Sequence, residues 1–283
     1  MRRARLRRVR PIAPFLAALL VCSVSVHAGE LRLEGAFVQG GLVEGRIEAN
    51  ARVWLDGREL RVRSDGLFLL GFGRDAAPEA LIELRHPDGA SETRVLSIAG
   101  RDYEIERIDG LVEEMVTPGA DELTRIETEA ALVAQARARD TDAPYFASGF
   151  AWPVLGPITG VYGSARILNG EPRRPHYGVD IAAPEGTLVR APADGIVALV
   201  HRDMFYTGGT VILDHGYGLS SAFLHMRAIV VVEGDLLRQG EVIGELGATG
   251  RASGAHLDWR VNLFDIRLDP ALLVGPMPAA GVP

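Results

Sequence analysis

Lysine is absent from the 283-residue sequence, so the 30 residues counted as lysine or arginine are all arginine. Schiff-base catalysis, phosphate-loop nucleotide binding and the attachment of biotin or lipoate each require a lysine side chain. The absence therefore excludes all of these functions. A biotinyl or lipoyl carrier, which the turn at 192–195 and the hairpin pattern at 234–240 would otherwise suggest, is excluded with them.

Cysteine occurs once, at Cys22, in an N-terminal segment that is unlike the rest of the chain. Six arginines precede an apolar run over 11–26, and the run ends in the small-residue pattern of 26–28. This order is typical of a secretory signal peptide, so we expect residues 1–28 to be cleaved. The protein would then be periplasmic or secreted and free of disulfides. It would be membrane-associated if the segment stays attached.

Basic residues are fewer than acidic ones, and the formal net charge is −7. Loss of residues 1–28 would remove six arginines and no acidic residue, which moves the charge to −13. Binding to phosphate groups needs clusters of Lys and Arg. We therefore expect no nucleic-acid partner.

Short alternating apolar runs separated by Asp-Gly pairs fill the segment that follows. The pairs fall at 56–57, 65–66 and 88–89, and Asp-Gly between such runs is a strong hairpin signal. We expect residues 29–115 to form a small antiparallel β-sandwich of Ig-like architecture.

A helix and a linker are predicted over 116–148. Thr117 suits the N-cap and Pro118 the first turn, and the helix would end near Asp140. Glu129 belongs to the charged face. The predicted apolar face consists of Leu123, Ile126, Ala130, Val133 and Ala134.

Residues 149–275 are again rich in short β-branched runs, with glycine or proline at nearly every turn, and 276–283 form a tail. The pattern predicts a second antiparallel β-domain. The fold class is therefore mainly β, with two β-domains joined by one helix.

Two pairs of polar residues in this second domain carry the candidate chemistry. His176 and Asp180 are four residues apart, and His256 and Asp258 are two apart in a predicted strand. Residues two apart on a strand project to the same face. His256 and Asp258 should therefore enter one groove, with Leu257 and Trp259 on the opposite face.

Imidazole nitrogen and carboxylate oxygen together suit zinc, and a catalytic zinc has three protein ligands and one open position. His176, Asp180 and Asp258 are the candidate ligands. His225 and His256 remain as groups that move protons or stabilise an oxyanion.

Both motifs resemble the signature motifs of the lysostaphin/LytM metallopeptidases, and the resemblance covers roughly residues 150–273. It implies an antiparallel sheet with an open groove and hydrolysis of peptide bonds in peptidoglycan. It also implies that His176 and Asp180 are zinc ligands and that His225 and His256 are catalytic. Further matching segments are 178–184, 191–195, 214–218, 224–226 and 247–250.

The sequence departs from the family pattern at Asp258, where the family has the second histidine of His-x-His as its third zinc ligand. Aspartate can ligate zinc, but a second carboxylate would make the metal a weaker Lewis acid. Asp258 could instead accept a hydrogen bond that orients His256, and His225 could be a buried core histidine. A family member with a decayed site could act as a non-catalytic activator, with a cell-wall amidase or divisome protein as partner. No oligomeric state is predicted.

Overall fold

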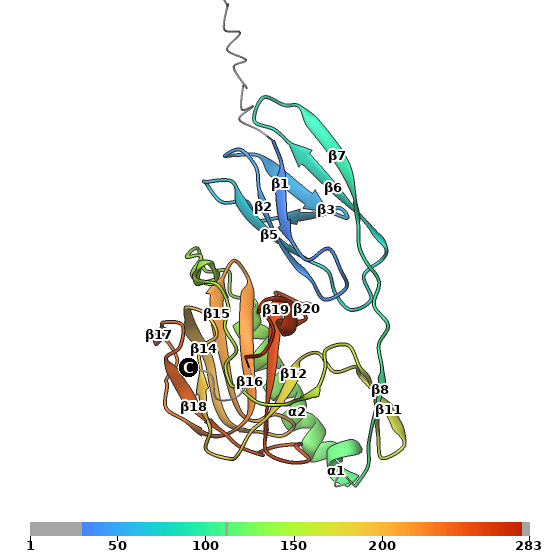
Figure 1. The fold of residues 1–283 in the computed structure, drawn as a ribbon, viewed down its shortest axis with the longest axis vertical. Helices are drawn as coiled ribbons and strands as arrows, with labels where there is room; N and C mark the ends of the chain where they lie inside the picture. The colour runs from blue at the N-terminus through green and yellow to red at the C-terminus, as the bar shows by residue number, and fades with distance from the viewer. Residues whose placement is uncertain (1–29, 111–112, 279–283) are drawn as a thin grey trace, which may run out of the picture.

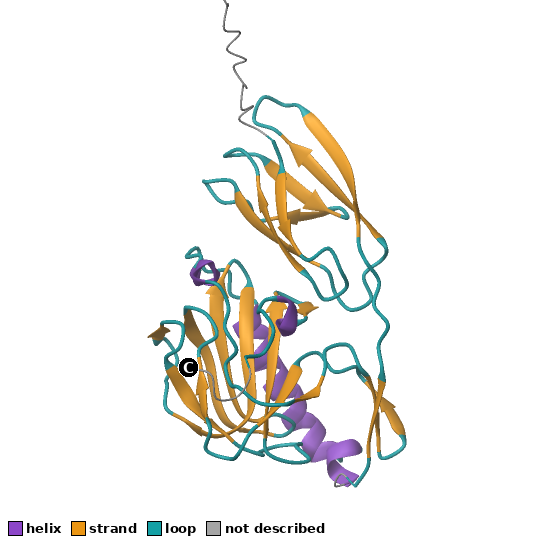
Figure 2. Ribbon diagram, viewed as in Figure 1, coloured by secondary structure: helices purple, strands orange, loops and turns teal. Residues whose placement is uncertain are grey.

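The computed structural model describes residues 30–110 and 113–278, so the signal-peptide prediction for 1–28 lies outside the described residues. The protein is mainly β, as predicted, and consists of two β-rich parts (Figure 2). Within the described ranges, no helix is both long and apolar enough to cross a membrane.

The N-terminal part is a small β-sandwich, as predicted. Its two antiparallel sheets have the orders β1-β2-β5 and β4-β3-β6-β7. Between the sheets, Val43, Phe68 and Ile82 are fully buried. The strands are β1 (Arg32–Gly35), β2 (Leu42–Arg46), β3 (Arg52–Leu55), β4 (Arg58–Leu60), β5 (Leu67–Gly71), β6 (Glu79–Arg85) and β7 (Ser91–Ser97).

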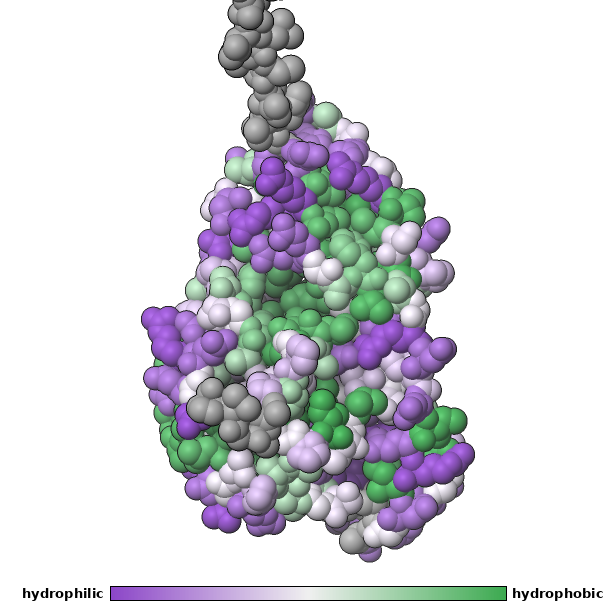
Figure 3. Space-filling model, in the orientation of Figure 1, coloured by the Kyte–Doolittle hydropathy of each residue, from purple (hydrophilic) through white to green (hydrophobic). Residues whose placement is uncertain are grey.

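Strand β5 is buried on both of its faces. Because successive side chains of a strand point to opposite faces, Phe68 and Leu70 enter the sandwich core, whereas Leu67 and Leu69 enter the core of the C-terminal part. Apolar residues gather across this junction in the space-filling view (Figure 3). The sandwich is thus packed directly onto the C-terminal part.

The C-terminal part is built on a large sheet whose main path runs β17-β14-β15-β16-β19-β12-β9 (Figure 1). Strand β18 pairs with β16 and β13, and β20 pairs with β19. The strands are β9 (Ile158–Gly160), β12 (Val179–Ala182), β13 (Leu188–Arg190), β14 (Gly195–Met204), β15 (Gly208–Gly216), β16 (Leu219–Ile229), β17 (Leu236–Leu237), β18 (Val242–Leu246), β19 (His256–Leu263) and β20 (Ile266–Leu268), and the 3₁₀ turns are Tyr145–Ser148 and Pro270–Leu272.

The helical segment differs from its prediction. A short helix α1 (Glu113–Val116) comes first, and α2 (Ala120–Arg137) follows with Gly119 as its N-cap. The predicted start at Thr117 is wrong, because the Thr117 amide donates to the Glu113 carbonyl and so completes α1.

Helix α2 packs on β14 and β15, where Val133 and Ala136 join a buried apolar cluster. The predicted apolar face is only partly right, since Leu123, Ala130 and Ala134 are exposed. Glu129, assigned to the outer face, is buried, and its carboxylate accepts from the Phe205 amide at 2.8 Å and from Arg125. These hydrogen bonds allow a carboxylate to occupy the packed face.

A small sheet of β8 (Ile105–Ile108), β10 (Ala165–Leu168) and β11 (Glu171–Arg173) lies beside the large one (Figure 1). Strand β8 falls within the range expected for the sandwich, yet it pairs in parallel with β10. This pairing brings a segment that precedes α2 to the edge of the candidate site.

Candidate metal centre

Asp180 and Asp258 face each other across the paired strands β12 and β19. Like charges directly opposite on a sheet are destabilising, and both side chains are buried. The paired strands therefore hold two buried carboxylates directly opposite each other, and positively charged groups must balance their charge.

His176 lies just before β12 and completes the group. Its Nε2 atom is 3.1 Å from Asp180 Oδ1 and 3.6 Å from Asp258 Oδ1. Zinc–ligand distances of about 2.1 Å at tetrahedral angles place ligand atoms about 3.4 Å apart. The three predicted ligands are thus brought together, with ligand atoms within 4.8 Å of one another.

Unsatisfied polar atoms support the fit to a metal ion. His176 Nε2 and Asp180 Oδ1 are buried and make no hydrogen bond within the described structure. Buried polar atoms normally have partners. His176 Nε2 and Asp180 Oδ1 lie 3.1 Å apart, close to the spacing of two ligand atoms that share one ion, so the residues present fit zinc.

The charged groups of this centre shift one another's pKa values. Burial lowers the pKa of His176, but the Asp258 and Asp180 carboxylates outweigh it and raise that pKa above its ordinary value. For Asp258, burial raises the pKa, yet Arg260 and His176 hold it well below the usual range. Asp258 is therefore a carboxylate, the form that binds metal.

Two arginines that sequence reasoning missed hold the carboxylates. Arg260 donates to Asp258, with Nη2 2.6 Å from Oδ2 and Nε 3.0 Å from Oδ1. Arg166 on β10 donates from Nη2 to Asp180 Oδ2 at 3.0 Å and from Nε to Glu106 at 2.9 Å. These contacts orient the ligand carboxylates, as outer-shell partners do at metal sites.

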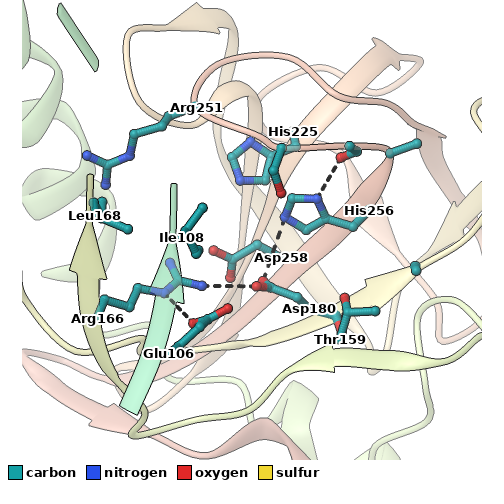
Figure 4. A pocket seen from close by; sticks show the side chains of 14 residues that line it. Glu106, Ile108, Thr159, Arg166, Leu168, Asp180, His225, Arg251, His256 and Asp258 are labelled. Atoms are coloured by element: carbon teal, nitrogen blue, oxygen red, sulfur yellow. Dashed lines mark hydrogen bonds and ion pairs between the residues drawn. The ribbon is translucent and has the colours of Figure 1, made fainter. Parts of the chain in front are cut away.

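Both predicted catalytic histidines lie next to the ligands (Figure 4). Their rings are 4.7 Å apart between centroids, and His256 Nε2 is 3.8 Å from Asp180 Oδ1. His225 Nδ1 lies 2.7 Å from the Thr249 carbonyl, and His256 Nδ1 lies 2.8 Å from the Gly254 carbonyl. Because a carbonyl only accepts, Nδ1 carries the hydrogen in both rings, and Nε2 is the free base.

Asp258 does not orient His256. The Nδ1 hydrogen of His256 is donated to the Gly254 carbonyl, and the Asp258 carboxylate accepts from Arg260. His225 has a φ of 65°, which is unusual for a residue other than glycine and is often found at functional sites. Burial lowers its pKa to about 4.

Two glycines leave room for the ligand carboxylates. A Cβ on Gly160 would lie 2.4 Å from Asp180 Oδ2, and a Cβ on Gly178 would lie 2.4 Å from Asp258 Oδ1. Any larger residue at either position would displace a ligand.

Other histidines lie away from the centre. His215 is buried and bonds to the Asp194 carbonyl and the Ser221 hydroxyl. Leu257 and Trp259 are fully buried in the core, on the face of β19 opposite His256 and Asp258.

The centre opens into a groove of about 290 Å³. Ile108 and Leu168 of the small sheet form one wall, and the segment from Ser253 to Ala255 forms another (Figure 4). An extended chain can therefore approach His256 and the carboxylates from solvent.

Comparison with known proteins identifies the family of the C-terminal part. Residues 174–270, which include both motifs, match peptidase family M23. The DD-carboxypeptidase/endopeptidase Mpg of Neisseria meningitidis is 39% identical over 105 residues, which is 37% of this chain and 24% of that protein. The peptidoglycan DD-endopeptidase ShyA of Vibrio cholerae is 36% identical over 102 residues, or 33% and 24% of the two chains.

A crystal structure from Pseudomonas aeruginosa assigned to peptidase M23 is 30% identical with a TM-score of 0.66, and the match covers 84% of this chain and 95% of that one. The fold is thus that of an M23-type peptidase domain with an appended sandwich. The chain belongs to peptidase family M23, as its lysostaphin/LytM-like motifs predict. It spans about a quarter of the length of the curated relatives named here.

Proposed function

We infer that this protein is a zinc-dependent endopeptidase that hydrolyses peptide bonds in peptidoglycan. The observation that carries the proposal is the buried group of His176, Asp180 and Asp258 beside two histidines that bond to backbone carbonyls through Nδ1, so that Nε2 is the basic nitrogen of each. The relatives named as peptidoglycan endopeptidases support the substrate class.

His176 Nε2, Asp180 Oδ1 and Asp258 Oδ1 would hold the zinc. The ion, when bound, polarises the scissile carbonyl and acidifies a water molecule. His256 and His225 accept a proton at Nε2, and a protonated Nε2 donates either to the oxyanion or to the leaving amine. Their Nδ1 bonds to backbone carbonyls fix the ring orientations, so neither ring must reorganise during the reaction.

Arg260 changes the expectation for the aspartate at position 258. The Asp258–Arg260 pair carries no net charge, like the neutral histidine that the family has at this position. The weakening of the Lewis acid that an added carboxylate alone would cause is therefore largely offset. Aspartate replaces histidine here as half of an ion pair.

Digestion of purified sacculi by the full chain, followed by identification of the released muropeptides, tests the proposal. We expect zinc-dependent release of cleaved stem peptides, with loss of release but not of zinc in His256→Ala. His201→Ala is the matched control, because His201 lies outside the groove. Release that is unaffected by His256→Ala would contradict the catalytic assignment.

A second candidate is a non-catalytic activator of a separate cell-wall amidase. One observation favours it: Arg166 and Arg260 form ion pairs with Asp180 and Asp258 and so balance their charges without a metal. An activator would release nothing from sacculi alone, would increase release by an added amidase, and would be unaffected by His176→Ala. We also propose a periplasmic or secreted location, which the N-terminal segment of the sequence supports.

A further inference from the structure

A cavity of about 600 Å³ lined by arginines adjoins the metal centre. It shares Asp258 and His225 with the groove described above, so the two spaces meet at the centre. Glu127 and Asp258 are its only acidic lining residues within the described structure. The arginines are Arg166, Arg173, Arg174, Arg251, Arg260 and Arg267. This concentration of positive charge is notable in a chain whose net charge is −7.

Not all of this charge is balanced within the protein. Arg166 and Arg260 pair with carboxylates of the metal centre. Arg267 on β20 has no carboxylate within ion-pair distance among the described residues, and its one side-chain hydrogen bond is a long contact, 3.5 Å, to Asn262. Its guanidinium lies 5.7 Å from the ring centroid of Tyr177, another cavity residue.

Arg267 is partly buried, and burial together with the neighbouring Arg260 lowers its pKa to about 10. A cation that is removed from water without an anionic partner is costly. A bound anion would offset that cost, and an arginine fork matches a carboxylate in a bidentate manner.

The remaining walls indicate what kind of anion enters. Besides the arginines, the lining includes Tyr177, Pro175 and Tyr206, and Ile126 and Ala130 of α2. Apolar and aromatic side chains beside the arginines suit an organic anion better than a free inorganic ion. A peptide whose scissile bond lies at the metal centre would place its neighbouring residue in this cavity.

We propose that this cavity is a subsite for an anionic group, in which Arg267 binds a free carboxylate of the peptide substrate close to the scissile bond. The proposal rests on the proposed function, because it assumes a peptide at the metal centre. Arg267 then determines specificity: it selects stem peptides with a free carboxylate over those in which the carboxylate is amidated.

Two probes test the subsite: cross-linked muropeptides with free carboxylates, and the same muropeptides after amidation with carbodiimide and ammonia. Hydrogen bonds to charged groups correspond to about a ten- to hundredfold effect. We expect wild-type kcat/KM to fall by this factor on amidation, mostly through KM. Arg267→Gln should remove the preference, and Arg267→Lys, which keeps the charge, should retain part of it. Arg202→Gln is the matched control, since Arg202 is exposed and lines neither space.

Binding of both probes to the chelator-treated full chain, measured by calorimetry, separates the two proposals. Cleavage of both probes at equal rates by wild type and Arg267→Gln would overturn the subsite and leave the proposed function standing. No cleavage, together with a binding preference for free carboxylates that Arg267→Gln abolishes, would support the subsite and overturn the peptidase. If the chain neither cleaves the probes nor binds one of them preferentially, both proposals are overturned.

Discussion

Replacement of Arg260 by methionine tests the coupling between the ion pair and the metal site. Asp258 is 1% exposed, and among the described residues Arg260 donates the three hydrogen bonds that its carboxylate accepts. Removal of one partner of a buried ion pair costs about 3–5 kcal/mol. For a chain of this size that corresponds to a fall in Tm of roughly 10 °C.

Zinc should recover most of this loss, because the ion would replace the guanidinium as the counter-charge of Asp258. Tm is measured by circular dichroism in chelator and in excess zinc. We expect the increase in Tm on adding zinc to be larger for Arg260→Met than for wild type. Arg227→Met is the matched control, since Arg227 forms an exposed pair with Glu245 that contributes about 1 kcal/mol or less. An equal fall in Tm with and without zinc would refute the reasoning.

Three further results are expected. Metal analysis of wild type should find about one zinc ion per chain. His176→Ala should lose the zinc, whereas Asp258→His should retain it. A metal-free Asp258→His would argue against position 258 as a ligand. Burial lowers the pKa of His215 to about 4 from about 6.5 in the unfolded chain, so only the unfolded state gains a proton as pH falls between these values. Stability should therefore drop by up to about 3 kcal/mol over that window, and urea unfolding of His215→Gln should show a smaller drop; an unchanged pH dependence would count against it. Leu69→Ala at the junction of the two parts should lower the free energy of unfolding by about 3 kcal/mol. The exposed Val95→Ala is the control and should lower it by about 0.5 kcal/mol or less. Equal losses in urea unfolding would mean that β5 does not join the two cores.

Strand periodicity was enough to predict the geometry of the second motif. The two-residue repeat placed His256 and Asp258 on one face and Leu257 and Trp259 in the core, and the structure confirms both. The same repeat extends to Arg260, so the partner of Asp258 could have been found from the sequence.

Arg166 could not have been found in this way. It reaches Asp180 only because β8 and β10 pair beside the large sheet, and nothing in the local sequence specifies that contact. The opposition of Asp180 and Asp258 likewise depends on the pairing of two strands that are far apart in the chain.

The helix prediction failed where a tertiary contact outweighed the local pattern. Glu129 was placed on the solvent face because it is charged, but the Phe205 amide and Arg125 satisfy its carboxylate in the packed interface. Hydrophobic periodicity cannot anticipate a buried acid whose backbone partner lies in a turn far along the chain, between β14 and β15.

The most direct test of the metal centre is an anomalous-difference map, measured at the zinc absorption edge, of crystals grown with zinc. We expect one peak about 2.0–2.2 Å from His176 Nε2 and from one carboxylate oxygen each of Asp180 and Asp258. A map without a peak at this position, with Asp258 bound only by Arg260, would contradict the account.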